Sequence, residues 1–108
     1  MMDIDVVKES DWKLFRKKLP GWQEAYMERL NKEYIELLNG EGDASHKFWA
    51  LEKRLQEDKT HIGVISHMTR SAMEKNLIAL LYEGAITLDD LNDFSDELRE
   101  RITSFVRH

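Results

Sequence analysis

The segment Ser71–Gly84, with the sequence Ser-Ala-Met-Glu-Lys-Asn-Leu-Ile-Ala-Leu-Leu-Tyr-Glu-Gly, is the most apolar stretch of the chain and decides its fold. Ser71 followed three residues later by Glu74 is the pattern of a capping box at a helix start. Gly84 is typical of the residue that ends a helix. The apolar positions between them are broad enough to contact neighbours on more than one side. We therefore expect the central helix of a bundle at residues 66–83, starting between Ser66 and Ser71, with Ser71 as the better cap.

Two further helices are predicted before a glycine-rich loop. Ser10 would cap a short helix at residues 10–19, and Pro20 would end it because proline cannot continue the helical hydrogen bonding. Residues 20–39 predict a second helix that stops at the loop of residues 40–43. The apolar stripes of these two helices are Trp12, Phe15 and Leu19, then Trp22, Tyr26, Leu30, Tyr34, Leu37 and Leu38.

A third helix is predicted at residues 44–58, capped by Asp43 or Ser45, with Phe48, Leu51 and Leu55 as its buried row. After Gly84, a short helical turn at residues 87–93 and a last helix at residues 95–106 form a broken C-terminal helix. The 108 residues, with one Pro and five Gly, are too few for two domains and too poor in turns for a β-fold. We expect an all-α, compact single-domain bundle of four main helices plus the broken one, spanning residues 1–108, with residues 1–9 as a frayed arm.

The pattern resembles a family of uncharacterised short all-helical proteins from Gram-positive bacteria. The resemblance spans residues 11–100 and is carried by residues 11–16, 19–24, 26–27, 30–34, 47–54, 84–91 and 94–100. It implies no activity, cofactor or catalytic residue. Such proteins sometimes carry the description "multidrug transporter", which this sequence contradicts. Its longest apolar run, residues 77–82, is six residues long, whereas a membrane span needs about 20.

The net charge of −5 argues against generic binding to nucleic acid or to anionic membranes, since both favour an excess of Lys and Arg. The absence of cysteine excludes disulfides, thiolate metal sites and a cysteine nucleophile. Residues 1–5, Met-Met-Asp-Ile-Asp, lack the basic and apolar regions of a signal peptide. We expect a soluble, cytoplasmic protein with no membrane partner.

Metal sites are poorly supported by the sequence. Asp43 with His46, and Asp58 with His61, loosely resemble the Glu-x-x-His pairs of helical-bundle metal sites. Both pairs lie at a helix end or in a loop, so we interpret each as an N-cap Asp beside an exposed His. The acidic stretch 89–96 lacks the glycine that an EF-hand loop needs at its sixth position. Aspartates at two helix starts explain it, because they complement the helix dipole.

Catalytic motifs are equally poorly represented. The chain has no Gly-x-Ser-x-Gly elbow and no phosphate-binding glycine loop, and the acidic loop at residues 40–43 would repel a phosphate. The sequence therefore predicts a protein that is not an enzyme, with no catalytic residue, no metal and no cofactor.

Aromatic and basic residues are the best candidates for function. Trp49 follows Phe48 directly, so both cannot point into one core, and Trp is enriched as an anchor in interfaces. The one basic cluster, Lys13, Arg16, Lys17 and Lys18, lies beside Trp12. We expect an interaction or regulatory module that binds a protein partner or itself through Trp49, Phe48, Trp12, Arg16 and Lys17. The alternative is a nucleic-acid-associated accessory protein that uses the cluster from Lys13 to Lys18.

Overall fold

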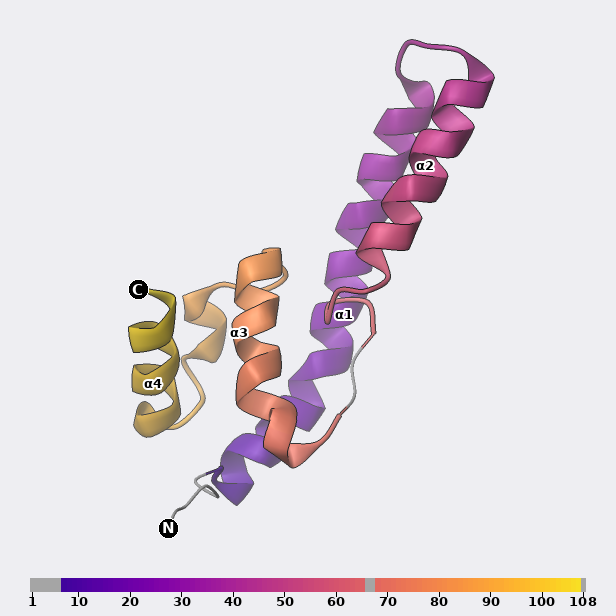
Figure 1. Cartoon of the computed structure of the whole chain (residues 1–108). Helices are drawn as coiled ribbons and strands as arrows, with labels where there is room; N and C mark the ends of the chain where they lie inside the picture. Colours follow the sequence, from indigo (N-terminus) through magenta and orange to yellow (C-terminus); the bar gives the residue numbers. More distant parts are fainter. Residues whose placement is uncertain (1–6, 66–67, 108) are drawn as a thin grey trace.

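The computed structural model describes residues 7–65 and 68–107 and is helical, with no β-strand in those ranges. Within these ranges, four α-helices and two short 3-10 helices follow one another (Figure 1). Their bounds are α1 Glu9–Asn39, α2 Ala44–Asp58, η1 Arg70–Ala72, α3 Met73–Glu83, η2 Leu88–Leu91 and α4 Asp96–Val106. The all-α prediction is therefore confirmed.

The helices predicted at residues 10–19 and 20–39 are one continuous helix, α1, with Pro20 in its interior. The prediction of a break at Pro20 was wrong because it considered only the hydrogen bond that proline loses in a helix interior and not the packing of the apolar stripe. Across Pro20 the apolar residues keep one helical phase, at positions 12, 15, 19, 22, 26 and 30. Continuing the helix through Pro20 lets this single stripe pack along its whole length, which offsets the lost hydrogen bond. α1 also starts at Glu9 with Lys8 at the N-cap position, rather than at the predicted cap Ser10.

The hydrophobic core lies at one end of the molecule, between the first half of α1, α3, η2 and α4. Met73, Leu77 and Leu80 of α3 are fully buried, so this helix is central, as its apolar sequence predicted. Trp22 of α1 stacks on Phe94 with ring centroids 6.4 Å apart. The buried core residues are Trp12, Phe15, Leu19, Met73, Leu77, Leu80, Ile86, Leu91, Phe94, Leu98 and Ile102.

The start of the central helix differs from the prediction of residues 66–83. Ser66 and His67 lie outside the described residues, and Ser71 belongs to the 3-10 turn η1, so that α3 begins only at Met73. The capping box does not form at Ser71. Glu74 instead accepts a hydrogen bond at 3.0 Å from Arg101 Nε of α4. The C-terminal prediction is confirmed, because Gly84 ends α3 in the left-handed conformation with φ 77°.

The last third of the chain follows its capping signals. Thr87 and Asp90 form a capping box around η2, with Thr87 N–H donating to Asp90 Oδ2 at 2.8 Å. Ser95 caps α4 by accepting a hydrogen bond from Leu98 N–H.

At the N-terminal end, residues 1–6 of the predicted arm lie outside the described residues. Val7 packs against the core and Glu9 is already helical, so the predicted arm of residues 1–9 extends too far.

The molecule is elongated, with principal extents of 57 × 27 × 23 Å. Its radius of gyration of 16.8 Å exceeds the about 13 Å expected for a compact chain of this length. The second half of α1 and all of α2 form a hairpin that projects beyond the core (Figure 1). The compact bundle predicted from the sequence is thus replaced by a small helical core with a two-helix projection.

Candidate functional site

The projecting hairpin is held together by polar contacts along one of its sides. Arg54 of α2 donates to Glu33 of α1 at 2.7 Å and lies 3.4 Å from Asp58. Tyr34 O–H donates to the buried Asp58 carboxylate at 2.6 Å. Burial and this hydrogen bond raise the pKa of Tyr34 to about 12, because ionisation would place a second negative charge beside Asp58. These contacts fix α2 against α1 in one register.

The connection after α2 ties the base of the hairpin to the core. Glu83, at the end of α3, accepts hydrogen bonds from the backbone N–H groups of Ile62 and Gly63 at 2.8 and 3.0 Å. Tyr26 O–H lies 2.8 Å from His61 Nδ1. Gly63 packs so closely on the Tyr26 ring that an added Cβ would lie 2.3 Å from it. These contacts carry no signal in the sequence because they join residues far apart in the chain; Gly63 alone stands out locally, as a glycine in an otherwise apolar segment.

Phe48 and Trp49 are the two most exposed aromatic residues of the hairpin, at 61% and 64% exposure. Their rings contact each other edge to face, with centroids 5.0 Å apart and planes at 88°. The predicted buried row of Phe48, Leu51 and Leu55 is wrong for Phe48 and Leu55, which are exposed. The reason is tertiary: in the described part of the chain α2 packs mainly against α1, and one neighbouring helix cannot cover the whole apolar face of α2.

One flank of the hairpin is apolar and continues from α2 onto α1. Near the tip, Leu38 lines a shallow hollow together with Phe48 and Leu51. Towards the base, a second hollow is lined by residues of both helices and of the connection, among them Met27, Tyr34, Leu55 and Val64. Leu38, which the sequence placed in the apolar stripe of the second helix, is exposed, and so is Ile35. The exposed apolar residues Leu38, Phe48 and Leu55 thus lie at these two hollows, and the lower hollow is also lined by the polar residues Asn31, Asp58 and Lys59.

The remaining predicted contact residues lie at the far end of α1. Trp12 is only 9% exposed and belongs to the core, with the Arg16 guanidinium 5.7 Å and the Arg70 guanidinium 5.9 Å from its ring centroid. Lys17 is exposed. Trp12 and Tyr34, which contacts α2, are separated by about 33 Å along the helix axis. The structure brings Phe48 and Trp49 together and places Trp12, Arg16 and Lys17 elsewhere.

Asp58 and His61, one of the two Asp-x-x-His pairs, have different hydrogen-bonding and ionic side-chain partners. Asp58 bonds to Tyr34 and Arg54, whereas His61 bonds to Tyr26. Asp43 sits at the N-cap position of α2 without a side-chain capping bond. In the described ranges, residues 7–65 and 68–107, no three His, Asp or Glu side chains come together in an arrangement that could hold a metal ion.

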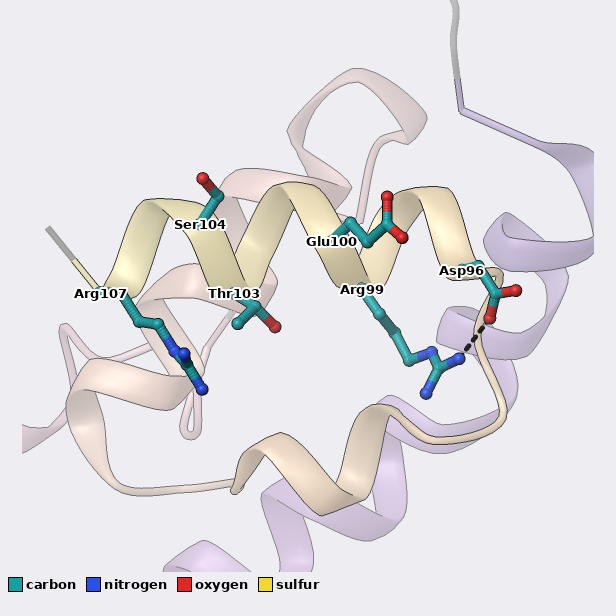
Figure 2. Close-up of a pocket in the computed structure, with 6 residues that line it drawn as sticks. All are labelled: Asp96, Arg99, Glu100, Thr103, Ser104 and Arg107. Carbon is teal, nitrogen blue, oxygen red and sulfur yellow. Dashed lines mark hydrogen bonds and ion pairs between the residues drawn. The ribbon is translucent and has the colours of Figure 1, made fainter.

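A further hollow runs along the surface of α4 (Figure 2). Arg99, Thr103 and Arg107 extend from one side of the helix, whereas Glu100 and Ser104 extend from the other. The Arg99 guanidinium is paired with Asp96 one turn earlier. Because this carboxylate already neutralises one of the two cations, the hollow is a weak candidate for an anion site.

The geometry defines an all-helical protein with a projecting two-helix hairpin. Hydrogen bonds hold the base of this hairpin to the core, and the hairpin exposes apolar side chains. None of the helices in the described part of the chain has the length and apolar character needed to cross a membrane. Comparison of the sequence with protein-family models and with curated proteins, and of the fold with solved structures, gives no match. The resemblance to the Gram-positive family stays a prediction.

Proposed function

We propose that the protein is a non-enzymatic interaction module whose binding element is the α1–α2 hairpin. The observation that carries this proposal is the adjacent pair Phe48 and Trp49, both more than half exposed on a projecting helix. Exposing two large aromatic side chains costs free energy in water, which an interface would recover. Trp is also among the residues that dominate binding energy when a partner covers them.

The anchoring of the hairpin supports the same proposal. The hydrogen bonds that Glu83 accepts from the connection, and the one that Tyr34 donates to Asp58, hold the hairpin in place before any partner arrives. Because the hairpin backbone is already ordered, binding a partner loses little conformational entropy there. More of the contact energy therefore appears as affinity.

The basic cluster offers less to the alternative function in nucleic-acid binding. Lys18 lies 3.6 Å from Asp93, and Arg16 lies over the Trp12 ring. Lys18 is thus paired with a carboxylate, and the remaining three cations of the cluster, Lys13, Arg16 and Lys17, would make only a few phosphate contacts, which give weak, salt-sensitive binding.

Paired variants test the proposal. Phe48→Ala and Trp49→Ala are compared with Tyr82→Ala, which removes an equally exposed aromatic residue from α3, outside the hairpin. The wild type and the three variants are measured for self-association by analytical ultracentrifugation and for capture of proteins from native lysate. We expect Phe48→Ala and Trp49→Ala to lower association at least tenfold while the helical circular dichroism stays unchanged, because hot-spot aromatics contribute about 2 kcal/mol or more.

Two results would contradict the proposal. Association that Tyr82→Ala lowers as much as Trp49→Ala would show that the hairpin is not the binding element. Loss of helicity in Phe48→Ala or Trp49→Ala would show that these side chains stabilise the fold rather than contact a partner.

A further inference from the structure

We infer that the groove between α1 and α2 on the Phe48 side of the hairpin binds an amphipathic α-helix of another protein, in which Lys and Arg border the apolar stripe. This inference rests on the proposed function and adds the chemistry of the partner. The groove consists of the two hollows described above, one at Leu38 and Phe48 near the tip and one at Met27 and Leu55 near the base. It is called the hairpin groove below.

The two hollows lie on the same side of the hairpin. On α1 their lining residues recur at intervals of four, three and four, which is the spacing of one helix face: Met27, Asn31, Tyr34 and Leu38. On α2 they recur at the same intervals: Ala44, Phe48, Leu51 and Leu55. From Met27 to Leu38 the helix rises by about 16 Å, so the groove has room for about three turns of a bound helix.

A third helix is the element that such a groove lacks. Because α2 packs mainly against α1, the apolar side chains between the two helices stay partly exposed, with Leu38 and Leu55 each at 44% and Phe48 at 61%. An amphipathic helix covers such a surface with apolar side chains spaced three or four residues apart. Trp49, whose ring meets Phe48 edge to face, extends the apolar surface at the outer edge of the groove.

The rim of the hairpin groove is acidic. Two carboxylates precede the lining residues of α1 at helical spacing, one lies on α2 between Phe48 and Leu55, and two flank Gly42, which lines the tip hollow. These carboxylates are Glu24, Glu28, Glu52, Glu41 and Asp43. All are exposed, and within residues 7–65 and 68–107 none of them forms an ion pair.

These charges select a cationic occupant. Only two cations, Lys47 and Lys59, line the hollows. Five carboxylates against two ammonium groups leave the groove with three unbalanced negative charges. Lys and Arg at the edges of a bound helix would complement these charges, whereas like charges across an interface suppress binding. The same repulsion disfavours a second copy of this chain as the occupant, because two facing grooves would both be acidic.

Fluorescence anisotropy with synthetic peptides tests this inference on the full chain. The first probe is a labelled amphipathic helix of Leu and Lys of about 14 residues, which spans the about 16 Å of the groove. The second probe has Glu in place of every Lys, and the third is a scrambled Leu/Lys peptide without an apolar face. We expect the Leu/Lys helix to bind at least tenfold more tightly than either of the others, and added salt to weaken its binding.

Two double variants with the same change in net charge locate the site. Glu24→Gln with Glu52→Gln removes one rim carboxylate from each helix. The matched control, Glu36→Gln with Glu57→Gln, removes one carboxylate from each helix at positions that line neither hollow. All four residues are exposed and outside the ion pairs, so folding is preserved, as circular dichroism would verify. We expect about fivefold weaker binding of the Leu/Lys helix in the first variant and a change below about twofold in the control.

The outcomes distinguish this inference from the proposed function. Equal binding of the Leu/Lys and Leu/Glu helices, no binding of the Leu/Lys helix, or equal weakening by the two double variants overturns the cationic helix as occupant of the groove. If self-association that depends on Phe48 is found together with any of these results, the proposed function stands and the partner is another copy. Binding of the Leu/Lys helix that Phe48→Ala leaves unchanged, where at least tenfold weakening is expected, overturns the groove as its site. The proposed function fails as well if self-association and lysate capture are also insensitive to Phe48→Ala.

Discussion

Asp11 and Ser95, 84 residues apart in sequence, are joined by two hydrogen bonds in the core. One Asp11 carboxylate oxygen accepts from Ser95 N–H at 2.9 Å and the other accepts from Ser95 Oγ–H at 2.6 Å. Ser95 is also the N-cap of α4, so this contact fixes the start of α4 against the start of α1. Asp11 is buried, and its charge is stabilised by these bonds and by the N-terminus of α4.

Replacing Asp11 by Ala is expected to destabilise the protein by about 2–3 kcal/mol, because it removes a charged acceptor and leaves the partly buried donors of Ser95 unsatisfied. Asp11→Asn, which keeps one acceptor oxygen, should cost about half as much. Urea unfolding followed by circular dichroism measures both. Asp43→Ala is the control: Asp43 occupies an N-cap position but makes no side-chain capping bond, so we expect a change within about 0.5 kcal/mol. An equal loss from Asp11→Ala and Asp43→Ala would contradict this assignment.

Much of the fold follows from local signals. The bounds of α2 and α4, the short helical turn after residue 87 and the stop at Gly84 were all predicted, because each depends on residues within one helical turn. The path through Pro20 was not predicted. There, the local penalty competes with the packing of a stripe that runs from Trp12 to Leu30, and only the tertiary structure shows which is larger.

The candidate site was predictable to a smaller extent. The adjacency of Phe48 and Trp49 indicated that one of them could not be buried with the other, whereas the structure exposes both. The exposure of Phe48 depends on how many helices surround α2, which no pattern within α2 encodes. The anchors Tyr34–Asp58 and Glu83–Gly63 join residues far apart in sequence and carry no local signal.

Gly63 is the position where a single methyl group should disturb the base of the hairpin. In Gly63→Ala the new Cβ would lie 2.3 Å from the Tyr26 ring, and the ring cannot move without losing its contact with His61. We expect a loss of about 1–3 kcal/mol in unfolding free energy, as for other overpacked sites. The matched control is Gly21→Ala within α1, where nothing lies within 4 Å of an added Cβ; alanine there should stabilise the helix by about 0.5–1 kcal/mol. Destabilisation by both substitutions would show that the close approach to Tyr26 is not the cause.

Tyr34 makes stability depend on pH in the alkaline range. Its pKa is raised from 10.0 to about 12 in the folded protein by burial and by the hydrogen bond to Asp58. A raised folded pKa means that the Tyr34 contribution is fully present below about pH 10 and is lost as the pH rises to about 12. The stability advantage of wild type over Tyr34→Phe should therefore be constant up to about pH 10 and then shrink.

Urea unfolding of both proteins between pH 8 and 12, at intervals of about half a pH unit, measures this difference, and tyrosinate absorbance reports the ionisation itself. Tyr26 also has a raised pKa, because of burial and the nearby Glu83. Both proteins contain it, so its effect cancels in the comparison. A difference that grows with pH above 10 would contradict the predicted sign.

Pro20 is the residue whose replacement should strengthen the scaffold. It lies in the interior of α1, is exposed, and removes the helical hydrogen bond to the carbonyl of Arg16. Pro20→Ala restores a donor at that position, and since Ala is up to about 3 kcal/mol more favourable than Pro in a helix interior, we expect unfolding free energy to rise by about 1–3 kcal/mol. Thermal and urea unfolding check this, and far-ultraviolet circular dichroism reports the gain in helicity. Pro20→Gly, which restores the donor without the helix propensity of alanine, should gain less. A loss of stability in Pro20→Ala would mean that the core formed by Trp12, Phe15 and Leu19 requires the local geometry that proline imposes on α1, and that the continuous stripe alone does not hold the helix together.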